Sequence, residues 1–151
     1  MVGDDHIPNF SSYMGNANIK RSNVAVQWDE QLVKEYLKCS KDPIYFIETY
    51  MKIINVDAGL VNFKLYDYQK EMIDSMANNR HTIIATARQI GKSTTTCGFI
   101  LWYIIFHSEK NVAILANKAE TAREILGRVQ LAYEHLPKWL QQGVLEWNKG
   151  S

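Results

Sequence analysis

The stretch "TARQIGKSTTT" at residues 86–96 constrains the fold most, because it sets Gly-Lys-Ser between two segments of different periodicity. The preceding "TIIATA" (82–87) predicts a short buried strand, and the following "KSTTTCGFILWYIIFHS" (92–108) predicts a helix that is apolar nearly all round. A second apolar run, "NVAILAN" (111–117), predicts another strand. Strand, helix and strand at this spacing indicate a βαβ unit with parallel strands and a right-handed crossover.

The junction between the first strand and the helix predicts a phosphate-binding loop of the Walker A type, G-x-x-x-x-G-K-[ST]. Backbone N–H groups from about Gln89 to Thr94 would form a nest at the helix N-terminus, and Gly91 would let the backbone approach a ligand closely. Lys92 would reach the β- and γ-phosphates of ATP, and the Ser93 hydroxyl would occupy one Mg²⁺ position. The alternative is an ordinary turn with an exposed Lys92. The predicted nucleotide-binding residues are Thr86, Ala87, Arg88, Gln89, Ile90, Gly91, Lys92, Ser93 and Thr94.

Two residues of the loop depart from the common pattern. Thr86 stands where the first glycine is usual, and a β-branched residue resists positive φ, so we expect a turn that does not need it there. Arg88 lies within reach of a γ-phosphate, where it would stabilise transition-state charge as a catalytic residue beside Lys92. A salt bridge that braces the loop is the alternative role for Arg88.

Residues 25–80 predict a small helical subdomain ahead of the loop. Helical spacing of apolar residues appears at 29–39 (Leu32, Val33, Tyr36, Leu37), at 42–51, and at 65–76 (Leu65, Tyr68, Met72, Ile73, Met76). Asp42 and Pro43 suit the start of the second helix. "DAG" at 57–59 is interpreted as a turn rather than as an acidic, metal-binding strand end. A further helix is expected at 118–136, ended by Pro137.

Gln69, in "YDYQ", offers an amide that suits the edge of adenine, with a neighbouring tyrosine to stack on the ring. The plain alternative is a solvated glutamine on a helix surface.

Both ends of the chain carry weaker signals. Residues 1–24 are rich in Asn, Gly and Ser without apolar periodicity, so we expect a mobile arm. "VLEW" (144–147) predicts a strand and "NKGS" (148–151) a hairpin turn whose return strand is missing. Two parallel strands and half a hairpin do not complete a sheet, so we expect this chain to be a fragment of a longer protein.

Composition bounds the class of protein. The chain has 151 residues, 46% of them hydrophobic and 22% charged, with a net charge of +1. These values are typical of one globular domain, and the net charge is too small to indicate an overall positive surface that would attract nucleic acid. The two cysteines and four histidines follow no metal-ligand or disulfide spacing. No secretory signal or apolar run long enough for a bilayer is present, which predicts a cytoplasmic protein.

Four motifs in order resemble the large terminase subunit of tailed phages, most closely the myovirus type: "FKLYDYQKEM", "TARQIGKSTT", "VAILANKAETAREIL" and "LEWNKGS". The resemblance runs from about Pro43 to Ser151. It implies an α/β fold of the P-loop NTPase class, with a helicase- or RecA-like parallel sheet and flanking helices. That core would begin near residue 81, follow the helical subdomain with its adenine-motif helix, and stop before the acidic Walker B strand.

The resemblance also implies a function. Large terminase subunits are motor ATPases that drive double-stranded DNA into a procapsid, and a C-terminal nuclease cuts the DNA. In that family the loop often lacks its first glycine and carries an arginine, so Lys92 and Ser93 would hold phosphate and Mg²⁺, Arg88 would act in cis, and Gln69 would read adenine. Expected partners are duplex DNA, the portal protein, the small terminase subunit and further copies in a ring. The protein would work in the host cytoplasm, docked transiently on the procapsid and without contact with a membrane.

The Walker B Asp-Glu pair and the nuclease carboxylates do not occur in this sequence, so we expect weak ATP binding and little hydrolysis by the chain alone. Two alternatives stay open: a superfamily-2-like nucleic-acid-dependent ATPase or helicase, and a non-catalytic nucleotide-binding module.

Overall fold

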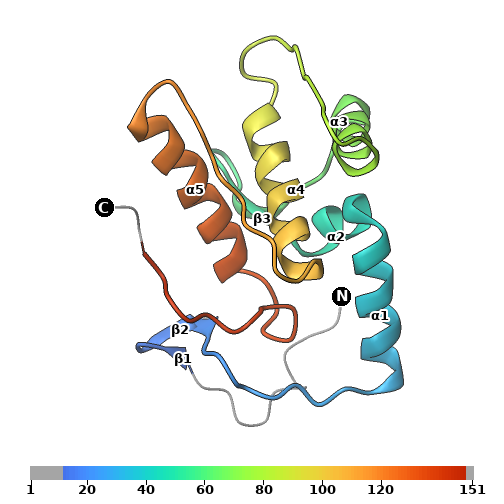
Figure 1. Cartoon of the computed structure of the whole chain (residues 1–151), viewed down its shortest axis with the longest axis vertical. Helices are drawn as coiled ribbons and strands as arrows, with labels where there is room; N and C mark the ends of the chain where they lie inside the picture. The colour runs from blue at the N-terminus through green and yellow to red at the C-terminus, as the bar shows by residue number, and fades with distance from the viewer. Residues whose placement is uncertain (1–11, 149–151) are drawn as a thin grey trace.

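The helix predicted after the loop, α4 (Lys92–Phe106), is the centre of the molecule. The computed structural model describes residues 12–148. In it α4 packs against α2, α3 and α5, which surround it in Figure 1. The buried residues of α4 share one face of the helix: Thr95, Cys97, Gly98, Leu101, Trp102 and Ile105. The opposite face carries half-buried side chains, among them Phe99, Ile100, Tyr103 and Ile104. At Gly98 the missing side chain admits α2, since a Cβ there would lie 3.0 Å from Ile47 and from Met51.

The three helices ahead of the loop form where the sequence predicts them. They are α1 (Glu30–Lys41), α2 (Pro43–Tyr50) and α3 (Asp67–Asn78). Side-chain caps fix the first two, because Asp29 accepts from Leu32 N at 2.7 Å and Asp42 accepts from Tyr45 N at 2.9 Å.

The predicted apolar face of α1 is only partly correct. Leu32 is buried and Tyr36 half-buried, but Val33 and Leu37 remain 41% and 48% exposed. The helix turns Leu32 and Cys39 toward the core instead.

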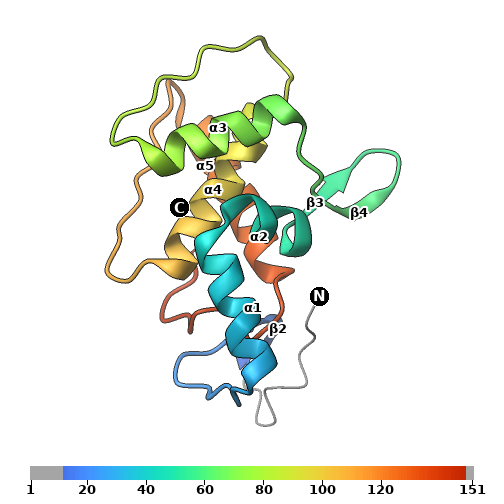
Figure 2. The same ribbon diagram turned by 90° about the vertical axis from the view of Figure 1, so that its right-hand side faces the viewer.

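A hairpin that the sequence analysis did not predict joins α2 to α3. Strands β3 (Lys52–Asn55) and β4 (Gly59–Asn62) pair antiparallel, and the hairpin projects from the body of the protein in Figure 2. The "DAG" segment forms its turn, as expected, with Gly59 at φ 70°. Asn55 stabilises the turn by accepting from the backbone N–H groups of Asp57 and Ala58.

A second hairpin corrects the expectation of a mobile arm over residues 12–24. Strands β1 (Ser12–Tyr13) and β2 (Asn16–Lys20) pair antiparallel, and Ile19 is fully buried. Apolar periodicity did not reveal this segment, because Ile19 is its one fully buried apolar side chain and polar side chains from distant residues hold its backbone. Residues 1–11, the remainder of the expected arm, lie outside the described residues.

Gln141 ties this hairpin to the end of α5 (Ala119–Glu134). Its Oε1 accepts from Lys20 N at 2.8 Å, and its Nε2 lies 2.9–3.3 Å from the carbonyls of Asn18, Tyr133 and Leu136. The side chain is 1% exposed, so these bonds replace those that water would otherwise make.

The predicted strands at 82–87 and 111–117 do not form. Ile83 is 97% and Leu115 90% exposed, although both were expected in a buried sheet. Ile84 and Leu115 line the same cavity, so the two segments face each other across a space instead of bonding to each other. Within residues 12–148 the sheets are the two antiparallel hairpins, and the fold is mixed α/β without the expected parallel sheet.

The strand predicted at 144–147 reduces to one parallel bridge between Arg21 and Val144. Gly143 permits this approach, since a Cβ there would lie 2.4 Å from the Cα of Ser22. Of the turn predicted at 148–151, residues 149–151 lie outside the described residues. No helix between residues 12 and 148 has the length and apolar character needed to cross a bilayer.

Both cysteines are core residues with free thiols, Cys39 on α1 and Cys97 on α4. Burial, reinforced by the Glu35 carboxylate, raises the pKa of the Cys39 thiol from 9.0 to about 12. Burial raises the pKa of the Cys97 thiol to about 11, against the opposing charge of Arg128. Both thiols are therefore protonated and inert at neutral pH.

We predict that Gln141→Ala lowers the free energy of unfolding by about 2–4 kcal/mol, because it removes the side-chain acceptor of the Lys20 N–H and the buried amide that three carbonyls share. Urea titration followed by circular dichroism measures this. Gln31→Ala, an exposed change of the same kind on α1, should stay within about 0.5 kcal/mol of wild type. Equal effects of the two substitutions would show that Gln141 does not hold the hairpin.

We predict that both thiols react slowly with a disulfide reagent at pH 8 until the chain unfolds. For Cys97 a pKa of about 11 instead of 9.0 reduces the thiolate fraction roughly a hundredfold. The single variants Cys39→Ser and Cys97→Ser assign each rate. Because folding raises these pKa values, stability should fall as the pH rises above about 9. Fast labelling of the native chain would contradict the buried positions.

Candidate functional site

Loop 86–91 makes a tight turn immediately before α4. Positive φ falls at Gln89 (64°) and Gly91 (79°), and Thr86 is not among the residues with positive φ. The turn therefore needs no glycine at position 86, in agreement with the expectation from the sequence. A non-glycine residue with positive φ is uncommon, so Gln89 marks a backbone held in place by its surroundings.

The backbone N–H groups of the loop and of the first helical turn are available to a ligand. In the part of the chain that the structure describes, none of the N–H groups from Gln89 to Thr94 meets a backbone acceptor. The first bond of this helix end runs from Thr95 N to Gly91 O at 2.9 Å. Unpaired amides at the positive end of a helix of 15 residues attract anions.

Two cations flank these amides. Lys92 is the first residue of α4, and its ammonium lies 3.4 Å from the Ala87 carbonyl, a long contact across the loop. Arg88 is exposed and, among residues 12–148, forms no hydrogen bond or ion pair. The salt bridge considered for Arg88 is therefore not formed by the described residues.

The hydroxyl groups of the first turn differ in whether they already make a hydrogen bond. Thr95 and Thr96 donate back to the carbonyls of Gly91 and Lys92 at 3.0 and 2.9 Å, so they are occupied. Thr94 accepts from Arg128 at 3.3 Å. The Ser93 hydroxyl makes no hydrogen bond within the described residues, so it can ligate an ion.

Arg128 is a neighbour of the loop that the sequence analysis did not single out. It lies on α5, and its guanidinium bridges Glu124 at 2.6 Å and Thr94 at 3.3 Å. The spacing of Glu124 and Arg128 indicates an ion pair on one helix face, but no sequence pattern indicates that this face meets the start of α4.

A metal ion would need ligands from outside the protein. No group of three or more His, Cys, Asp or Glu side chains between residues 12 and 148 could hold one. Ser93 offers a single oxygen. This arrangement fits Mg²⁺ that arrives with phosphate oxygens, because Mg²⁺ commonly takes few protein ligands and keeps waters.

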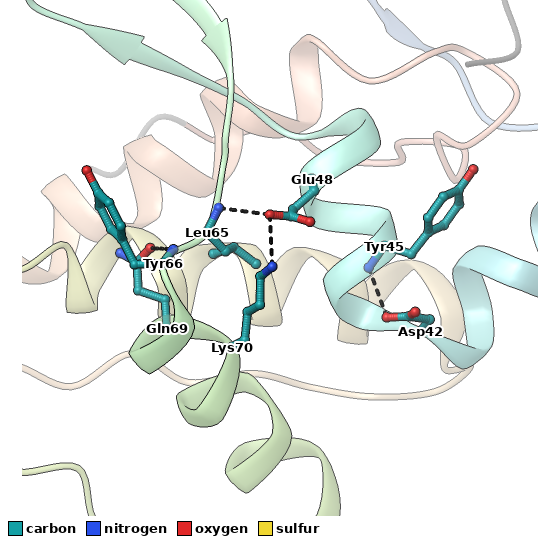
Figure 3. Close-up of polar contacts among 7 residues, drawn as sticks. All are labelled: Asp42, Tyr45, Glu48, Leu65, Tyr66, Gln69 and Lys70. Atoms are coloured by element: carbon teal, nitrogen blue, oxygen red, sulfur yellow. Dashed lines mark hydrogen bonds and ion pairs between the residues drawn. The ribbon is translucent and has the colours of Figure 1, made fainter.

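Gln69 lies against the loop instead of in solvent. The side chain is 2% exposed; its Oε1 accepts from Tyr66 N at 3.0 Å, and its Nε2 donates to the Ile90 carbonyl at 3.3 Å. Figure 3 shows the first of these bonds. The role of Gln69 at adenine stays a prediction, and its amide is engaged inside the protein.

The start of α3 is fastened to α2, as Figure 3 also shows. Glu48 accepts from Leu65 N at 3.1 Å and pairs with Lys70 at 3.6 Å. Both contacts flank Gln69 in sequence, so the turn that carries Gln69 is fixed from either side.

A cavity of about 350 Å³ lies beside α4 and touches the loop region at Lys92 and Ser93. Its other walls are mostly apolar, contributed by Met72, Ile84, Thr96, Ile100, Ala113, Ile114, Leu115 and Ile125. Such walls do not suit a triphosphate, which carries several charges. The row of free amides is therefore the candidate anion site, and the cavity is a separate apolar feature on the flank of α4.

Residues 83–151 match the family model described as terminase large subunit, T4likevirus-type, N-terminal. The matched segment includes the loop from Thr86, with Lys92 and Ser93, and continues through α4 and α5. Gln69 and the helices α1 to α3 precede it.

Proposed function

We propose that the chain, whose residues 83–151 match the N-terminal part of T4likevirus-type large terminase subunits, supplies the ATP-binding part of a viral DNA-packaging motor. The observation that carries this proposal is the row of unpaired N–H groups from Gln89 to Thr94 at the N-terminus of α4. A polyphosphate placed there would accept from several amides and meet the positive end of the helix.

In this proposal each polar side chain of the loop has a role. The Lys92 ammonium would leave its long contact with Ala87 and bind the β- and γ-phosphates. The Ser93 hydroxyl would ligate Mg²⁺ together with phosphate oxygens. Arg88, exposed beside the turn, would stabilise charge on the γ-phosphate during transfer to water.

The wider function rests on the match to this family. ATP hydrolysis, through a P-loop NTPase core, would drive duplex DNA into the procapsid while the protein is docked on the portal. The small terminase subunit and further copies in a ring would be its partners, in the host cytoplasm. DNA cutting would belong to a nuclease that these residues do not contain.

We predict that Lys92→Ala weakens binding of Mg-ATP to the chain at least roughly tenfold, because a charge-assisted contact to phosphate is lost. Isothermal titration calorimetry measures the dissociation constant. Lys110→Ala removes the same charge from an exposed position outside the loop and should leave the affinity unchanged. Equal losses in the two variants would point to a general charge effect and against a site at Lys92.

In packaging assays with procapsid, portal and the complete large subunit, Lys92→Ala should abolish ATP-driven DNA uptake, and Lys110→Ala should support it. Packaging that continues with Lys92→Ala would overturn the motor assignment.

A further inference from the structure

The first turn of α3 holds one carbonyl group of the loop. The Tyr68 hydroxyl donates to the Ile90 carbonyl at 2.8 Å, and Gln69 Nε2 donates to the same oxygen at 3.3 Å. Two donors from one turn therefore converge on a single peptide group. Gln69 cannot turn elsewhere freely, because its oxygen is bound to Tyr66 N and its side chain is 2% exposed.

The position of this carbonyl decides where the next amide points. No cis peptide bond occurs in residues 12–148, and in a planar trans peptide the C=O and the following N–H point in opposite directions. Holding the Ile90 carbonyl against α3 therefore turns the Gly91 N–H away from α3. That N–H belongs to the unpaired row from Gln89 to Thr94.

Close packing at Gly91 strengthens the arrangement. A Cβ at Gly91 would lie 2.7 Å from Gln69 Nε2, and its φ of 79° disfavours any other residue. The turn that carries the two donors is itself rigid, since Glu48 binds Leu65 N and Lys70 on either side of it. The rings of Tyr66 and Tyr68 also stack, with centroids 5.7 Å apart.

We infer that Tyr68 and Gln69 are positioning residues that orient the loop amides toward polyphosphate. This inference rests on the proposed phosphate binding at the loop. It identifies the chemistry that this positioning serves as the polyphosphate chain. A loop that spends less time in this shape loses affinity by the same factor for every ligand that uses the amides.

The test compares three ligands, Mg-ATP, Mg-GTP and inorganic tripolyphosphate with Mg²⁺, by calorimetry on the 151-residue chain. Tyr68→Phe should weaken all three by a common factor, roughly two- to tenfold, the effect of one hydrogen bond. Gln69→Ala should likewise weaken binding of tripolyphosphate, which carries no base. Tyr66→Phe is the matched control, because it keeps the stacked ring and its hydroxyl makes no bond within the described residues.

Thermal unfolding separates positioning from general loss of structure. Gln69 is buried, so its replacement can lower the unfolding midpoint, whereas Tyr68 is 40% exposed. Tyr68→Phe should unfold at the same temperature midpoint as Tyr66→Phe, while its affinities for the three ligands fall.

Three outcomes overturn the inference. Loss of ATP affinity alone, with GTP and tripolyphosphate unchanged, would make Gln69 an adenine reader. Unchanged affinities for all three ligands in both variants would remove the positioning role and leave the proposed function intact. A wild-type chain that binds none of the three ligands would overturn the proposed function together with this inference.

Discussion

A helix that is apolar on nearly every side needs several elements packed against it, and this requirement on α4 organises the rest of the fold. Segments from both directions of the chain supply the cover: α2 and α3 precede α4, and α5 follows it. Gly98 lets α2 approach closely enough to exclude water. The first N–H groups of a helix have no acceptor within it, so the N-terminal end of α4 is where unpaired polar groups remain. Within residues 12–148, the elements packed along the sides of α4 supply no side-chain cap for this end.

Polar contacts with a defined geometry hold the N-terminal hairpin against the end of α5. The end of α5 would have little to hold it to the first strands without Gln141, whose amide reaches β2 and the last turn of the helix at once. A buried amide is costly unless its bonds are made, so it favours one arrangement of hairpin and helix over many looser ones. Close backbone approach at Gly143 and Ser22 extends this contact along the chain.

Helices were predictable from this sequence because their signals are local. Asp29, Asp42 and Pro43 mark starts that the structure confirms, and the "DAG" turn is where it was expected. The segments at 82–87 and 111–117 failed for a non-local reason: an apolar run becomes a strand only beside another backbone, and here a cavity lies between them. The N-terminal hairpin and the contact of Gln69 with Ile90 were equally hidden, because neither bonding partner is near in sequence. The residues of loop 86–91 were identified from their motif, whereas the contacts that shape the loop were not.

The threonine at position 86 fits a loop whose shape is imposed from outside. In a loop shaped by its own residues, glycines would be needed wherever φ is positive. Here Tyr68 and Gln69 fix the Ile90 carbonyl, α4 fixes Gly91, and positive φ is confined to Gln89 and Gly91. The start of the loop then has ordinary backbone freedom, and a β-branched residue costs nothing there. On this view the absence of a glycine at position 86 and the bonds from α3 to the Ile90 carbonyl belong together, because the helix before the loop helps to orient the loop amides.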